Sequence, residues 1–188
     1  MKIARQTRRV GRLRNPHTVI DTPELASFWE AQIRTLGRSV FFVETGCVLA
    51  SLTPSTQAMV GGLLKELVSN GLSDRLVTST YVIAEAIRRL IKSKPREFVG
   101  PGGEQKTDLA LYLLFQWLSD NKVAIICPPE AVFDEAKRLF REHRALGCDL
   151  SDVISYVIVR GLEQDRILSQ DGHFRSLGLT TLLPSPVA

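Results

Sequence analysis

Four carboxylates stand at the edges of apolar segments and carry most of the chemical information in the sequence: Glu44, Glu85, Asp152 and Asp171. Glu44 ends the apolar run Val40–Val43, and Asp171 follows Ile167-Leu168-Ser169 in the same way. Side chains just past the carboxyl ends of parallel strands meet in the ligand crevice of an open α/β sheet. Acids gathered there repel one another unless a cation holds them, and a set of oxygen ligands suits Mg²⁺ or Mn²⁺. The pattern therefore indicates metal-assisted phosphate chemistry.

The elements that must position these acids alternate between short apolar runs and amphipathic stretches. We expect strands at 40–43, 75–78, 123–126, 166–169 and 179–183, and helices at 22–37, 55–69, 80–92, 105–119, 130–145 and 149–161. The clearest loop is 94–104, which contains Pro101-Gly102-Gly103. Strands separated by helices of this length predict an α/β fold, with a central parallel sheet of about five strands and helices on both faces.

Each acid also has a purely structural explanation. The two acids that follow strands can be the first polar residues of ordinary turns. Glu85 is followed by Arg88 and Arg89 at i+3 and i+4, so a surface ion pair worth about 0.2–0.5 kcal/mol would account for it. Asp149 and Asp152 can cap the N-terminus of their helix, where the free N–H groups favour carboxylates. These local roles leave the joint placement of the acids at one expected sheet edge unexplained.

The order of these residues resembles that of PIN-domain ribonucleases, most closely the small VapC-type toxins of toxin–antitoxin pairs. Glu44-Thr45-Gly46 is similar to the family's Asp-Thr-Ser opening, and Thr80–Glu85 resembles its helix glutamate. Leu150–Tyr156 is similar to the third acidic segment, and Ser169–Phe174 to the closing acid with its trailing His-Phe. The resemblance covers roughly residues 39–185 and implies a PIN-like three-layer sandwich.

The resemblance implies a Mg²⁺- or Mn²⁺-dependent ribonuclease that hydrolyses RNA phosphodiester bonds, and it points to the toxin of a toxin–antitoxin pair. The implied catalytic and metal-binding residues are Glu44, Glu85, Asp152 and Asp171, supported from around the metal site by Thr45, Asp149 and His173. The bases that we expect to contact the RNA backbone are Arg88, Arg89 and Arg175. The expected partners are RNA, an antitoxin protein and a second copy of the chain in a homodimer.

The first acid departs from the family pattern, because Glu44 stands where the family usually has aspartate. The extra methylene moves the carboxylate by about 1.5 Å, and a near-octahedral Mg²⁺ site tolerates little distortion. This substitution leaves three alternatives: the activity is kept with a shifted metal, the activity is reduced, or the activity is lost. In the last case the chain is a catalytically impaired PIN-like domain that acts as an RNA- or protein-binding module. A third alternative, a phosphotransfer receiver, needs two adjacent acids near the first strand and a lysine after a late strand, and the sequence shows neither.

The composition of the 188 residues, 44% hydrophobic and 23% charged, fits one globular domain. No apolar stretch approaches the ~20 residues of a membrane helix, so we expect no membrane association. The three cysteines form no CxxC pair, and we expect free thiols in a reducing cytosol and a cytoplasmic protein.

The net charge of +4 originates at the N-terminus, since residues 1–20 contain one lysine, five arginines and no acid. Such an arm can contact nucleic-acid phosphates. It can equally be a solvated tail, a mis-assigned start or a transit peptide. We divide the chain into a basic flexible arm (1–20), an N-terminal helical extension (21–38) and a PIN-like domain (39–188).

Overall fold

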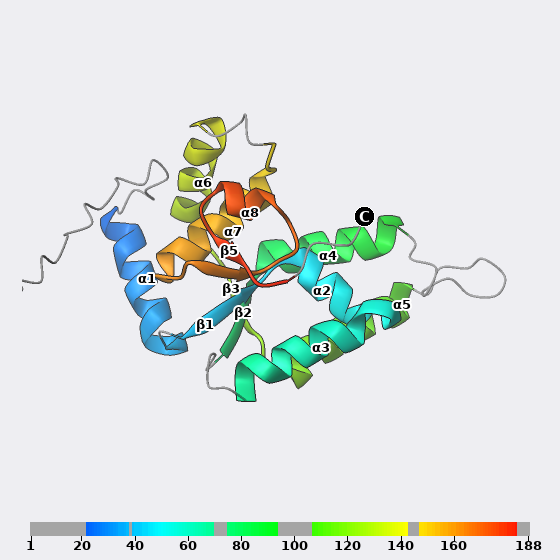
Figure 1. Cartoon of the computed structure of the whole chain (residues 1–188). Coiled ribbons are helices and arrows are strands. Elements are labelled where there is room, and N and C mark those ends of the chain that lie inside the picture. The colour runs from blue at the N-terminus through cyan, green and yellow to red at the C-terminus, as the bar shows by residue number, and fades with distance from the viewer. Residues whose placement is uncertain (1–21, 38, 70–74, 94–106, 143–146, 184–188) are drawn as a thin grey trace, which may run out of the picture.

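The computed structural model of the chain describes residues 22–37, 39–69, 75–93, 107–142 and 147–183 (Figure 1). The predicted basic arm at 1–20 and the predicted loop at 94–104 lie outside these described residues.

A parallel sheet of five strands forms the centre of the molecule. The strands are β1 (Val40–Val43), β2 (Arg75–Ser79), β3 (Ala124–Ile126), β4 (Arg166–Leu168) and β5 (Thr180–Thr181). Their order is β3-β2-β1-β4-β5, and every neighbouring pair is parallel. β1 occupies the middle of the sheet, which explains why all four of its residues are apolar and buried. The α/β prediction with about five parallel strands is confirmed.

Helices cover the sheet on both sides. They are α1 (Pro23–Leu36), α2 (Thr45–Leu52), α3 (Pro54–Ser69), α4 (Thr80–Ser93), α5 (Thr107–Asp120), α6 (Glu130–Glu142), α7 (Leu150–Gly161) and α8 (His173–Ser176). In Figure 1, α1, α6 and α7 lie on one side of the sheet, and α3 and α5 lie on the other. Helix α7 belongs to the core, because every residue from Asp152 to Val159 is buried.

Two of these helices, α2 and α8, were not predicted. The chain turns directly from β1 into α2, whose apolar residues Cys47, Val48 and Leu52 are buried. α2 stops at Thr53, which is extended (φ −88°, ψ 119°) because the residue before a proline is disfavoured in helical conformation. This break divides residues 45–69 into the helices α2 and α3, and only α3 has a clear helical pattern in the sequence. α8 is a single turn and leaves almost no periodic signal.

The predicted N-terminal helix packs against the rest of the protein. The N-cap of α1 is Thr22, whose side chain accepts a hydrogen bond from the backbone of Leu25 (3.3 Å), and its C-cap is Gly37 with φ 86°. The indole of Trp29 lies so close to Gly161 of α7 that a Cβ at position 161 would overlap the ring. The extension therefore buries its apolar face against the domain. The boundary between them at residue 38 stays a prediction.

No single helix in the described part of the chain is long and apolar enough to cross a membrane. One bent pair, Thr45–Leu52 with Thr56–Leu67 at 117°, meets the length and composition of a span when its two helices are taken together. Among the described residues, Cys47, Cys127 and Cys148 are all free thiols.

Candidate active site

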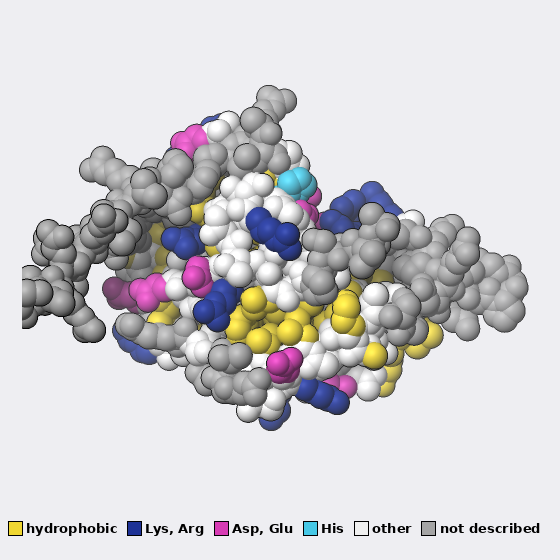
Figure 2. All heavy atoms as spheres, in the orientation of Figure 1, with side chains coloured by type: hydrophobic (Ala, Val, Ile, Leu, Met, Phe, Trp, Pro, Cys, Tyr) yellow, Lys and Arg dark blue, Asp and Glu magenta, His cyan; other side chains and the backbone are white. Residues whose placement is uncertain are grey.

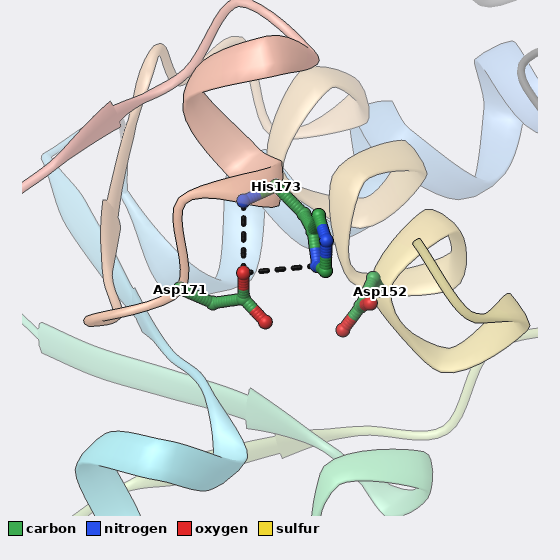
Figure 3. Close-up of side chains that lie close together, drawn as sticks. All are labelled: Asp152, Asp171 and His173. Atoms are coloured by element: carbon green, nitrogen blue, oxygen red, sulfur yellow. Dashed lines mark hydrogen bonds and ion pairs between the residues drawn. The ribbon is translucent and has the colours of Figure 1, made fainter. Parts of the chain in front are cut away.

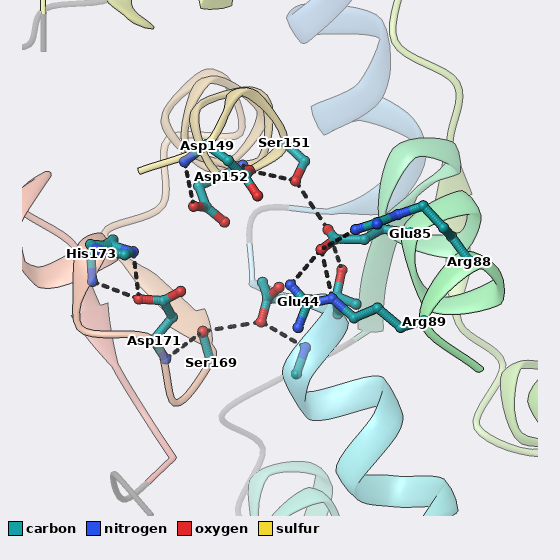
Figure 4. Close-up of polar contacts among 12 residues, drawn as sticks. Glu44, Glu85, Arg88, Arg89, Asp149, Ser151, Asp152, Ser169, Asp171 and His173 are labelled. Atoms are coloured by element: carbon teal, nitrogen blue, oxygen red, sulfur yellow. Dashed lines mark hydrogen bonds and ion pairs between the residues drawn. The ribbon is translucent and has the colours of Figure 1, made fainter. Parts of the chain in front are cut away.

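The four acids surround one space at the carboxyl ends of β1 and β4. These neighbouring strands stand where the strand order reverses, which is where open α/β sheets bind ligands. Glu44 follows β1 directly, and Asp171 follows β4 by three residues. Glu85 comes from α4 and Asp152 from the first turn of α7. Figure 4 shows all four carboxylates facing the same region, as the sequence predicts.

Glu44 joins the end of β1 to the start of α2. Its side chain is the N-cap of α2, and Oε2 accepts hydrogen bonds from the backbone N–H of Gly46 (2.8 Å) and from the hydroxyl of Ser169 (3.2 Å). The residue is only 7% exposed. Burial raises the pKa of Glu44 and the charge of Glu85 adds to the rise, whereas the two hydrogen bonds lower it. Glu44 is thus a buried carboxylate with a fixed orientation.

Glu85, on α4, accepts hydrogen bonds from residues of α2 and α7 and so links these three helices. Oε2 accepts from the hydroxyls of Thr45 (3.1 Å) and Ser151 (3.0 Å), at the starts of α2 and α7. Oε1 accepts from Nε of Arg89 (2.8 Å), and Arg88 lies farther away, at 3.9 Å. The ion pair between Glu85 and Arg89, which was the purely structural alternative for this acid, is therefore present. The contacts to Thr45 and Ser151 show that Glu85 also holds two helix N-termini at the acidic site.

Asp149 and Asp152 form a reciprocal cap at the N-terminus of α7. Asp149 Oδ1 accepts from the backbone of Asp152 (3.0 Å), and Asp152 Oδ2 accepts from the backbone of Asp149 (3.0 Å). The capping role predicted for both is therefore present. The pKa of Asp149 is lowered, because hydrogen bonds from Ser151 and from the α7 backbone outweigh the opposing effect of burial.

Asp152 has a second property that capping does not explain. Burial raises its pKa to about 7, and the charges of Asp149, Asp171 and Glu44 contribute to the rise. A carboxylate that is desolvated and faces three other acids is held in an environment that favours a bound cation. Its location in the first turn of the buried helix α7 accounts for both roles.

Asp171 is fixed by the residues on either side of it. Its backbone N–H donates to Ser169 Oγ (3.0 Å), and its Oδ1 accepts from the backbone N–H of His173 (2.8 Å). Nδ1 of His173 lies 3.0 Å from the same oxygen. Ser169 was not among the predicted site residues, although it bridges Glu44 and Asp171. The available signal was a small polar residue that ends a buried strand, immediately before an expected ligand.

Ligand atoms of Asp152, Asp171 and His173 all lie within 4.8 Å of one another (Figure 3). Two carboxylate oxygens and one imidazole nitrogen are a suitable donor set for Mn²⁺ and for a hydrated Mg²⁺. Glu44 and Glu85 face the same space but lie outside this tight group, so their roles as metal ligands stay predictions. In the space-filling view, histidine, acidic and basic side chains are neighbours at the surface between α8 and α4 (Figure 2).

The three predicted RNA-binding arginines differ in their positions. Arg89 lies at the acidic site: its hydrogen bond to Glu85 raises the pKa of its guanidinium against the opposing effect of burial, and the charges of Glu44 and Asp149 act in the same direction. The Arg88 side chain is 56% exposed. Nε of Arg175, on α8, donates to Thr181 of β5 (2.6 Å). Arg89 is the basic side chain that the structure brings closest to the acids among these three.

This fold and this set of acids define an α/β protein with a candidate metal site of the nuclease type. The family model described as "PIN domain" matches residues 41–178, most of the chain, so the chain belongs to the PIN-domain family. The resemblance noted from the sequence is confirmed. Comparison with the curated proteins gives no match.

Two solved structures similar to this chain are VapC toxin structures. One is VapC20 of Mycobacterium tuberculosis, described as a toxin that cleaves the sarcin-ricin loop (TM-score 0.59, 18% identity). The match covers 78% of this chain and 100% of that one. The other is VapBC2 of Rickettsia felis bound to a DNA fragment from its promoter (TM-score 0.56, 14% identity, 76% and 97% covered). At these identities the likeness establishes the fold.

Proposed function

We propose that the protein is a divalent-metal-dependent ribonuclease of the PIN-domain family. The observation that carries the proposal is the grouping of Asp152, Asp171 and His173 ligand atoms within 4.8 Å, next to the buried carboxylate of Glu44. The four acids come from four separate elements, and local capping or turn formation does not require them to meet. A PIN fold with this cluster at the switch point of its sheet supports phosphodiester hydrolysis.

Each residue has a proposed task. Asp152 and Asp171 hold one cation, with His173 as a nitrogen ligand or as the partner that orients Asp171. A bound Mg²⁺ or Mn²⁺ supplies charge neutralisation at the phosphate and lowers the pKa of water. Glu44 contributes a further carboxylate whose direction is fixed by Gly46 and Ser169.

Two residues support this group from its margin. Glu85 holds the starts of α2 and α7 in register through Thr45 and Ser151. Arg89 is the basic side chain that we expect to contact an RNA phosphate beside the metal. Metal-assisted hydrolysis of this kind needs no serine or cysteine nucleophile.

We further propose that the protein acts as the toxin of a toxin–antitoxin pair and forms a homodimer. The likeness to VapC20 and to VapBC2 supports the assignment as a toxin, whereas the homodimer stays a prediction from the sequence. A hollow of about 1000 Å³, away from the acids, lies between α3 and α5 and includes Leu64, Leu113 and Trp117. This groove is the surface that we expect an apolar segment of an antitoxin to cover.

The decisive experiment compares RNA cleavage by the wild type, Asp152→Asn and Asp171→Asn in the presence of Mn²⁺, Mg²⁺ or EDTA. We expect cleavage by the wild type with metal, and its loss in EDTA and in either variant, while circular dichroism shows all three proteins folded. Binding of Mn²⁺ is measured in parallel by calorimetry. A wild type that binds RNA but neither Mn²⁺ nor Mg²⁺ would instead identify the domain as an impaired PIN-like binding module.

A further inference from the structure

The carboxylate of Glu44 is folded back over the first turn of α2. Its Oε2 accepts from the backbone N–H of Gly46, only two residues further on (2.8 Å). Aspartate caps a helix through a side chain that is shorter by one methylene, so a glutamate at an N-cap must bend to reach the same N–H groups. The bend brings the carboxylate of Glu44 directly against position 46.

A larger residue at position 46 would crowd the Glu44 carboxylate, which would have to move by a few tenths of an ångström. A Cβ added at Gly46 would lie 3.1 Å from Glu44 Oε2, closer than the 3.4–4 Å of an ordinary van der Waals contact. The backbone does not explain the glycine, because Gly46 is not among the glycines with positive φ and lies within the helix. Alanine suits such a position better than glycine does. The close approach of the carboxylate is therefore the local feature that a glycine accommodates.

The carboxylate is also held from the other side. Ser169 donates to the same Oε2 (3.2 Å) and accepts from the backbone of Asp171 (3.0 Å). Oε2 thus lies between the α2 backbone and the segment that carries Asp171. A side chain at position 46 would push Oε2 toward or away from Ser169 by a few tenths of an ångström. Such a shift matters at a metal site, since Mg²⁺ requires near-ideal geometry.

We propose that Gly46 is a positioning residue matched to Glu44: the glycine lets the longer carboxylate fold back onto the start of α2 and keeps its oxygens directed into the acidic site. Glu44 and Gly46 then form a compensated pair, in which the extra methylene of the first residue is accommodated by the missing Cβ of the second. The inference rests on the proposed metal-dependent function. It gives Gly46 a role at the metal site that Gly46 exerts through Glu44 and not as a ligand.

The test is a double-mutant cycle with the wild type, Gly46→Ala, Glu44→Asp and the double variant. Mn²⁺ affinity is measured by calorimetry and by the rise of the melting temperature with added Mn²⁺. We expect Gly46→Ala to weaken Mn²⁺ binding about three- to tenfold in the wild-type background. In the Glu44→Asp background the same change should weaken binding by less than about twofold, because the shorter aspartate side chain clears the added Cβ.

The same cycle in EDTA tests the contact without metal. Gly46→Ala should raise the melting temperature of the Glu44→Asp protein, as alanine does in a helix, and raise that of the wild type by less. The matched control is Gly62→Ala, at an exposed position of α3 where nothing lies within 4 Å of the added Cβ. It should raise the melting temperature and leave Mn²⁺ affinity unchanged.

The outcomes separate the two proposals. If Gly46→Ala has equal effects in the wild-type and Glu44→Asp backgrounds in both measurements, the pair is not coupled and the inference is wrong. A wild type that binds neither Mn²⁺ nor Mg²⁺ overturns the proposed function and, with it, the role of Gly46 toward a cation. In that case coupling in EDTA would still report the steric contact itself.

Discussion

The hydroxyl of Ser169 donates a hydrogen bond to Oε2 of Glu44 (3.2 Å), across 125 positions of the sequence. The same oxygen of Ser169 accepts the backbone N–H of Asp171 (3.0 Å). One small side chain at the end of β4 therefore fixes the acid that follows β1 relative to the acid that follows β4. Ser169 is fully buried, so water cannot take over either bond if the hydroxyl is removed.

Ser169→Ala should weaken both the fold and the metal site. Loss of the buried hydrogen bonds should lower the free energy of unfolding by about 1–2 kcal/mol. The pKa of Glu44 should rise further, because the Ser169 hydrogen bond is one of the interactions that lower it. Urea unfolding and Mn²⁺ calorimetry measure the two effects. Ser119→Ala, at an exposed position of α5, is the control and should change neither. Unchanged Mn²⁺ affinity in Ser169→Ala would contradict a positioning role.

In the metal-free protein, the stabilisation that the protonated Asp152 contributes should be lost as the pH rises from about 4 to about 7. The pKa of Asp152 is about 7 in the folded chain against 3.8 for an unperturbed aspartate, so the folded state binds this proton more tightly than the unfolded state does. The stabilisation is complete below a pH of about 4 and is lost as the pH rises through about 7. Asp152→Asn cannot titrate, so the difference between the two proteins in EDTA isolates this carboxyl. Parallel pH profiles of the two melting temperatures would show that Asp152 is not perturbed.

The sheet was predictable because its central strands are apolar. β1 is buried along its whole length and β4 at Ile167 and Leu168, so their sequences read as apolar runs, and the acids beyond them mark the strand ends. The ends of the shorter outer strands were predicted less accurately: a strand was expected at 179–183, and the structure has β5 at Thr180–Thr181. A two-residue edge strand is defined by its partner and leaves little pattern of its own.

The joint position of the four acids was also predictable, but their contacts were not. Spacing along the chain indicates that Glu44 and Asp171 follow strands, whereas the parallel pairing of β1 with β4 decides that they meet. The bridging role of Ser169 and the link from Glu85 to Ser151 depend on that tertiary arrangement. His173 enters the tight ligand group because the single turn of α8 brings its ring back over Asp171, and a four-residue helix has no period to detect.

Removal of the imidazole should change the preference between metals. His173→Asn replaces the only nitrogen donor of the three-residue ligand group. Because imidazole suits Mn²⁺ whereas Mg²⁺ prefers oxygen ligands, the variant should bind Mn²⁺ more weakly and retain most of its Mg²⁺ affinity. Melting temperatures with millimolar Mn²⁺ or Mg²⁺ measure the change: the wild type should be stabilised more by Mn²⁺, and the variant about equally by both. An unchanged preference would show that His173 acts on Asp171 alone.

Arg89 and Arg88 form a matched pair for testing contact with RNA. Arg89 donates to Glu85 beside the acids (2.8 Å), whereas Arg88 is 56% exposed and 3.9 Å from the same carboxylate. Arg89→Gln should raise KM for RNA more than Arg88→Gln does, and it should reduce the salt dependence of RNA binding by about one unit of slope. Fluorescence anisotropy at several salt concentrations gives the slope. Equal effects of the two variants would assign both residues to the general basic surface.

Gly161→Ala should loosen the contact between α1 and α7. The added Cβ would overlap Cε2 and Cδ2 of Trp29, so the indole and the helix that carries it must shift. Overpacking of this kind costs about 1–3 kcal/mol, and the urea unfolding midpoint should fall accordingly.

Gly62→Ala is the control for Gly161→Ala, since the open space around position 62 lets alanine keep its usual helical advantage over glycine. Gly161 is the last residue of α7, at the opposite end from Asp152 in the first turn, and the residue that must shift is Trp29 of α1. Mn²⁺ affinity per folded molecule should therefore be the same in Gly161→Ala as in the wild type. An unfolding midpoint equal to that of the wild type would mean that Trp29 does not pack on α7 in solution. The N-terminal helix would then be free to bind elsewhere.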